Sequence, residues 1–112
     1  MLFRSKQSTK QRFTAFEFDY PEAQLETRIV ARETGTDEAL AGQLVKIGNV
    51  ARNLKGHGLD EGISTRLLVY AATLIKDGVD PQDACRMALV RPITDDADIR
   101  ETLDHAIDAT FA

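Results

Sequence analysis

Residues 62–78, GISTRLLVYAATLIKDG, carry the strongest helix signal in the chain. Ser64 is a natural helix cap, because its hydroxyl can accept a hydrogen bond from the first free backbone amides. Apolar residues then recur at the spacing of one helix face. The segment predicts a helix from Thr65 to about Asp77. Its buried face is expected to consist of Leu67, Leu68, Ala71, Leu74 and Ile75.

Arg66 is poorly placed in this helix, because it lies in a first turn that already carries positive partial charge. A cation there costs roughly 0.3–1 kcal/mol. Two explanations stay open. Its stem covers apolar surface while its head pairs with Asp60 or Glu61, or it binds an anion such as phosphate together with the free amides. Arg66 shares a stripe with Tyr70 and Asp77 beside the apolar face, which would allow it to point into a cleft.

Four further helices are expected around this one. The first covers residues 22–34, buries Leu25, Ile29 and Val30, and ends at Gly35. The second covers 37–54 with Asp37 as its cap, and residues 56–62, GHGLDEG, follow as a glycine-rich loop. The remaining two are a short helix capped by Asp80, with Pro81 in its first position and an end near Val90, and a last helix after the cap region 94–96 that aligns Ile99, Leu103, Ile107 and Phe111.

Residues 13–20, FTAFEFDY, alternate between apolar and acidic side chains and predict a β-strand that Pro21 ends. The sequence offers this strand no partner, although strand backbone groups need partners. The expected fold is therefore mainly α: a helical bundle preceded by one orphan strand. Either the strand pairs with another copy of the chain, or the sheet to which it belongs is missing, which points to a fragment of a larger fold.

Composition indicates one globular domain. The chain has 112 residues, of which 43% are hydrophobic and 29% charged. Net charge is −4, and the only basic run is residues 1–12, which argues against a nucleic-acid-binding domain. No apolar run suggests a signal peptide or membrane insertion. A single cysteine, Cys85, fits a reducing compartment, so a cytoplasmic location is expected.

The pattern Gly-x-Ser-x-Arg at the start of an apolar helix resembles the second-sensor motif of the MoxR branch of AAA+ ATPases. Three segments, STKQRFTAFEFDYP, GISTRLLVYAATLIKDG and DACRMALVRPITDD, are similar to the C-terminal part of the CbbQ/NirQ/NorQ group. The resemblance runs from about Ser8 to the end of the chain. It implies that residues 1–21 are a remnant of the AAA+ α/β core with its last strand, and that residues 22–112 are the helical lid.

The same resemblance implies roles for four residues. Gly62, Ser64 and Arg66 match the second-sensor motif, in which the arginine reaches from the lid to the nucleotide phosphates. Arg12 lies where an arginine finger would act in trans on the ATP site of a neighbouring subunit. Lys10 and Arg4 also lie close by and compete for that role.

Family membership implies a ring-forming, chaperone-like activator of Rubisco or nitric oxide reductase. Its expected partner is a von Willebrand factor A-domain protein of the CbbO or NorD kind. The sequence contains neither a GxxxxGK[ST] phosphate loop nor an apolar run ending in paired acids. We therefore expect ATP with Mg²⁺ to bind only in a complete protein, and this chain alone to be inactive.

Two other functions stay open. The chain would have the same sequence if it were an independent helical adapter that joins a related AAA+ ring. The helices at 65–77 and 81–90 could also imitate a helix-turn-helix, but the second offers only Arg86 as a strong donor to bases. No metal site is expected, because His57, His105 and Cys85 have no metal-site spacing.

Overall fold

The computed structural model describes residues 20–54 and 62–111, and the regular structure within these ranges is helical. The expected helices are confirmed. In chain order they are α1 (Ala23–Thr34), α2 (Glu38–Asn53), α3 (Thr65–Lys76), α4 (Pro81–Cys85), the π-helix η1 (Arg86–Val90) that continues α4, and α5 (Ala97–Phe111). The expected strand at 13–20 lies outside the described residues apart from Tyr20, which belongs to no regular element.

The helix boundaries follow from capping side chains that the sequence already displays. Asp37 accepts a hydrogen bond from the Leu40 amide at 2.8 Å, and Ser64 accepts one from the Leu67 amide at 3.3 Å. Gly35 closes α1 in the left-handed region, with φ 73°, where a Cβ would be strained.

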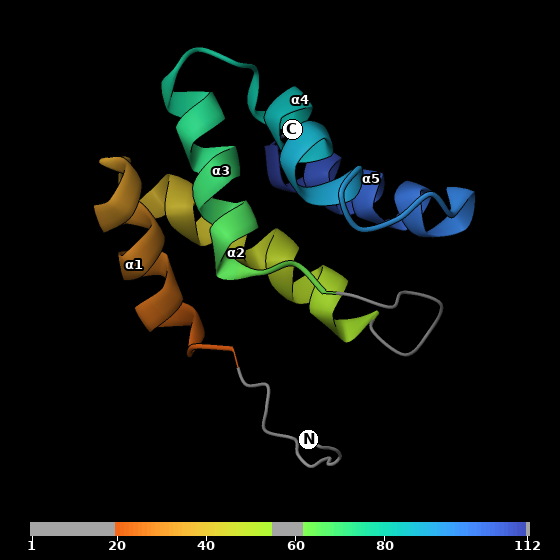
Figure 1. The fold of residues 1–112 in the computed structure, drawn as a ribbon, viewed down its shortest axis with the longest axis horizontal. Coiled ribbons are helices and arrows are strands. Elements are labelled where there is room, and N and C mark those ends of the chain that lie inside the picture. Colours follow the sequence, from red (N-terminus) through yellow and green to blue (C-terminus); the bar gives the residue numbers. More distant parts are fainter. Residues whose placement is uncertain (1–19, 55–61, 112) are drawn as a thin grey trace, which may run out of the picture.

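The helices pack in two groups that share α2 and α3 (Figure 1). On one side, α1 packs against both α2 and α3. On the other, α4 and η1 pack against α3, and α5 packs against α2 and α4. The core between them is aliphatic, and its largest fully buried apolar side chains are Leu44, Ile47, Ile63, Leu68, Leu89, Leu103 and Ile107.

Two local predictions need correction. Leu25 was expected in the core but is 47% exposed, whereas the neighbouring Glu26 is fully buried. The face of α1 that meets α2 and α3 is therefore rotated toward Glu26, because that carboxylate finds charged and polar partners there. The helix expected to end near Val90 does so, but its second half is a π-helix in which the Arg91 amide donates to the Arg86 carbonyl at 3.1 Å.

Candidate functional site

Arg66 lies in the first turn of α3 with an exposed side chain. Within residues 20–54 and 62–111 no carboxylate forms an ion pair with it. Asp60 and Glu61, the partners considered from sequence, lie outside the described residues. Tyr70, one turn further along the same stripe, is 47% exposed. The stripe therefore forms an open surface of the helix and not the wall of a cleft between the described helices.

Gly62 and Ser64 shape the turn that leads into α3. Ser64 is extended, with φ −80° and ψ 162°, and caps the helix as expected. A Cβ built on Gly62 would lie 2.7 Å from the Tyr20 hydroxyl oxygen and 3.3 Å from Cγ of Arg52. Only glycine therefore fits this position without displacing a neighbour. Arg12, the expected arginine finger, lies outside the described residues.

Beneath this turn lies a buried ion pair between Glu26 of α1 and Arg52 of α2. Both guanidinium NH groups donate to the two carboxylate oxygens at 2.7 Å. The Glu26 side chain is 0% exposed and the Arg52 side chain 7%. Such a two-pronged arrangement is the strongest hydrogen-bonded pairing available to these groups. It ties α1 to α2 in the interior of the domain.

Both members of the pair also bind the start of α3. Arg52 Nε donates to the Ile63 carbonyl at 2.9 Å, and the Thr65 hydroxyl donates to Glu26 Oε2 at 2.6 Å. Burial alone would raise the pKa of Glu26. The hydrogen bonds from Arg52 and Thr65, together with the Arg52 charge, outweigh burial and hold that pKa below its usual value.

Tyr20 covers the outer side of the same arginine. Its ring centroid lies 3.8 Å from the guanidinium carbon of Arg52, a cation–π contact. The residue that leads the chain into α1 thus contacts the residue that holds the turn before α3. Tyr20 stacks on Arg52, and Gly62 lies against both side chains.

Sequence reasoning missed this network of Glu26, Arg52 and Thr65. The one available signal was the spacing of Glu26, which lies four residues before the buried Val30 and so on the inner face of α1. Its partner is 26 residues away in the sequence. Helical periodicity does not identify a partner at that separation.

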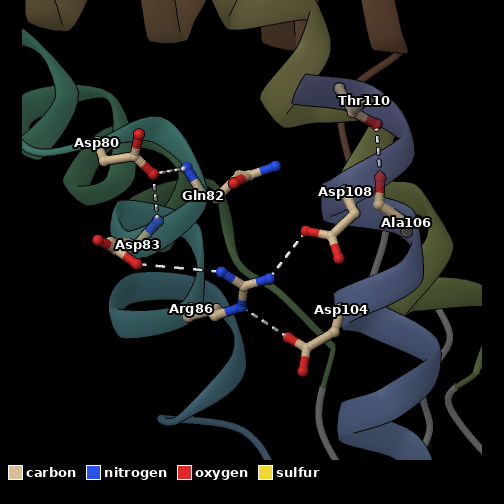
Figure 2. Close-up of polar contacts among 8 residues, drawn as sticks. All are labelled: Asp80, Gln82, Asp83, Arg86, Asp104, Ala106, Asp108 and Thr110. Carbon is tan, nitrogen blue, oxygen red and sulfur yellow. Dashed lines mark hydrogen bonds and ion pairs between the residues drawn. The ribbon is translucent and has the colours of Figure 1, made fainter. Parts of the chain in front are cut away.

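Arg86 of η1 binds carboxylates of α5 (Figure 2). Its guanidinium turns toward α5, where Nε donates to Asp104 at 3.2 Å and Nη2 donates to Asp108 at 2.8 Å. In the helix-turn-helix hypothesis, Arg86 is the one strong hydrogen-bond donor that could contact DNA bases. Because its donors are taken by carboxylates, the structure disfavours that reading.

The remaining sequence predictions concern the cysteine, metal sites and membrane insertion. Cys85 is buried, as expected of a packed small residue, and burial raises the pKa of its thiol to about 12. The described residues contain no group of three or more potential metal ligands. None of the helices in the described ranges is long and apolar enough to cross a membrane.

Comparison with known proteins gives a consistent family. The family model described as CbbQ/NirQ/NorQ C-terminal matches residues 26–110. The chain is 58% identical over 107 residues to Protein CbbQ of Hydrogenophilus thermoluteolus, and 55% identical over 91 residues to the denitrification regulatory protein NirQ of Pseudomonas aeruginosa. It is 46% identical over 106 residues to Protein NorQ of Paracoccus denitrificans.

These matches cover most of this chain but a smaller share of the relatives. They span 96%, 81% and 95% of this chain, and 40%, 35% and 39% of the three relatives respectively. The matched family model describes the C-terminal region of such proteins. The chain therefore belongs to the CbbQ/NirQ/NorQ family and corresponds to its C-terminal region.

Proposed function

We propose that this chain is the helical lid of a MoxR-type AAA+ ATPase and that Arg66 is its second-sensor residue. The observation that carries the proposal is an exposed guanidinium in the first turn of α3, without an ion-pair partner among the residues described. A nucleotide phosphate at this position accepts hydrogen bonds from Arg66 and from free amides of the turn. The bound anion also removes the unfavourable interaction of the cation with the helix dipole.

The lid acts with elements outside the described residues. In this proposal ATP and Mg²⁺ bind to an α/β core that precedes the lid, and Arg12 serves as the arginine finger for the neighbouring subunit of a homo-oligomeric ring. Loss of phosphate contacts at Arg66 lets the lid move relative to the core, which turns hydrolysis into motion.

The biological role proposed is chaperone-like activation of Rubisco or nitric oxide reductase, together with a von Willebrand factor A-domain partner of the CbbO or NorD kind. The NirQ relatives are named denitrification regulatory proteins, which supports a regulatory role of this class. The family resemblance supports the partner, the ring and a cytoplasmic location.

A chimera tests the sensor assignment. This chain replaces the matching C-terminal segment of CbbQ from Hydrogenophilus thermoluteolus, to which it is 58% identical, and the intact CbbQ is measured in parallel. Arg66→Ala should lower kcat/KM for ATP hydrolysis by about 10- to 150-fold, the equivalent of losing about 1.5–3 kcal/mol of charge-assisted hydrogen bonding. Arg91→Ala removes another exposed arginine and should leave hydrolysis unchanged.

Equal ATP hydrolysis by the Arg66→Ala and Arg91→Ala chimeras would refute the sensor role. A different failure would favour the adapter function. In that case the unsubstituted chimera does not hydrolyse ATP, while the isolated 112-residue chain binds to the intact CbbQ ring. Size-exclusion chromatography with light scattering detects that complex.

A further inference from the structure

We propose that Glu26 and Arg52 are positioning residues for Arg66. They hold the turn that leads into α3 in one conformation. In that conformation the Arg66 guanidinium and the free amides of the first helical turn can bind the same phosphate. The inference rests on the proposed function of Arg66 as a phosphate sensor. It adds two residues that touch no nucleotide and act through the backbone of the turn.

The pair grips the turn on both sides of the helix cap. Arg52 Nε binds the carbonyl of Ile63, the residue before Ser64, at 2.9 Å. Glu26 Oε2 binds the hydroxyl of Thr65, the residue after Ser64, at 2.6 Å. The backbone before the cap and the side chain after it are therefore both held. These contacts restrict the turn and the first residues of α3, and thereby the direction in which Arg66, two residues after the cap, leaves the helix.

The remaining donors of Arg52 leave it little freedom of its own. Its two NH groups hold both oxygens of Glu26 at 2.7 Å, and Nη1 also lies 3.1 Å from the Asn49 side-chain oxygen. The Tyr20 ring stacks on its face at 3.8 Å. Because these contacts immobilise the Arg52 guanidinium, its bond to the Ile63 carbonyl can fix the position of the turn.

The chemistry of the pair also favours positioning over mere stability. Removing two charges from water is costly, and well-packed apolar residues of similar volume often stabilise a fold equally well or better. The planar fork of an arginine adds directionality that apolar contacts lack. Here the two Nη groups of Arg52 orient Glu26, which accepts the Thr65 hydroxyl. Nε of Arg52 binds the Ile63 carbonyl.

Hydrogen exchange on this chain tests the structural half of the inference. The amides of Leu67 and Leu68 both donate to Ser64 and report on the turn. Arg52→Lys keeps the charge but loses the fork, and should speed exchange at these amides by about tenfold relative to the amide of Leu103 in the core, since local opening has its own free energy. Arg86→Lys is the matched control and should leave the ratio unchanged.

A uniform rise in exchange across the core would overturn the inference, because it would show that Arg52 only supports global stability. An unchanged ratio would overturn it as well. If Arg52→Lys does not fold, Thr65→Val replaces it. This variant keeps the side-chain shape, removes only the hydroxyl bond to Glu26, and should raise the same ratio.

A double-mutant cycle in the chimera tests the functional half with ATP as the probe. Arg52→Lys should raise the KM for ATP by about tenfold. In an Arg66→Ala background it should have no further effect, because a positioning residue has nothing left to position. Additive losses, or no loss from Arg52→Lys alone, would overturn the inference while the sensor role stands. No loss from Arg66→Ala would overturn the sensor role itself, and the exchange result would still be informative.

Discussion

Removing the buried carboxylate of Glu26 should cost this domain a large part of its stability. In Glu26→Ala the guanidinium of Arg52, only 7% exposed, loses both carboxylate bonds, and the Thr65 hydroxyl loses its acceptor. Breaking a buried pair by deleting one partner typically costs about 3–5 kcal/mol. Native domains are stable by only about 5–15 kcal/mol. The variant should therefore lose a substantial fraction of the free energy of unfolding.

Urea denaturation followed by helical circular dichroism measures this loss, with Asp104→Ala as the matched control. Asp104 also pairs with an arginine, but its side chain is 40% exposed and that of Arg86 is 34% exposed. Exposed pairs contribute about 1 kcal/mol or less. The control should therefore lose about 1 kcal/mol or less. The larger loss expected in Glu26→Ala reflects the burial of its pair and the loss of the Thr65 bond, whereas Arg86 keeps Asp108 as a partner in the control.

The double variant Glu26→Ala/Arg52→Ala sharpens the test. Much of the cost of each single change comes from the charge that it leaves buried without its partner, so the double variant should lose clearly less than the sum. Strict additivity would refute the reasoning. So would a loss below about 1 kcal/mol in Glu26→Ala, the range of an exposed pair.

Other outcomes follow from burial and charge. The pKa of Glu26 is held below its usual value of 4.5, so its contribution to folding is present above that pH and lost as the pH falls through the lowered pKa. Glu26→Gln should flatten this part of a urea-midpoint profile measured from neutral to acid pH. Burial raises the pKa of the Cys85 thiol from 9.0 to about 12. Above pH 9.0 the thiol therefore ionises in the unfolded chain before it does so in the folded one, and the free energy of unfolding falls as the pH rises toward 12. Cys85→Ala should flatten the alkaline side of the same profile. The folded chain should also react with a thiol reagent only as fast as it opens, and rapid labelling would contradict the burial. Leu103→Ala should cost about 2–5 kcal/mol in urea denaturation, whereas Met87→Ala, at a side chain 40% exposed, should stay within about 0.5 kcal/mol of the wild type.

The helices were predictable because their signals are local. Asp37, Ser64 and Asp80 are capping side chains whose partners lie two or three residues away, and the structure confirms all three caps. The apolar stripe of α5 places Ile99, Leu103 and Ile107 in the core as expected. Each of these features depends on neighbours within one or two helical turns.

The rotation of α1 was not predictable in the same way. Hydrophobicity favoured Leu25 over Glu26 for the core, and only the distant Arg52 and Thr65 reverse that preference. A buried charge is tolerated when a partner awaits it, and the partner is set by tertiary contacts. The π-helical turn of η1 likewise has no signal in the sequence that we recognise.

The sequence predicted the position of the three motif residues at the start of a helix but not their surroundings. The motif located Gly62, Ser64 and Arg66 together at the start of a helix, and they lie there. Their sequence does not contain the ion pair beneath them, because it is supplied by α1 and α2. The role of Arg66 toward a nucleotide stays a prediction.

The close approach of Tyr20 to Gly62 indicates that the three motif positions are under different constraints. A Cβ at position 62 would lie 2.7 Å from the Tyr20 hydroxyl oxygen, and the Ser64 side chain caps α3. Both positions therefore have a local structural role that does not depend on a nucleotide. Position 66 makes no ion pair within the described fold. Under the proposed sensor role, relatives without nucleotide binding should keep small and capping residues at positions 62 and 64 while position 66 varies, so a survey of related genomes tests the role of position 66 separately from that of the turn.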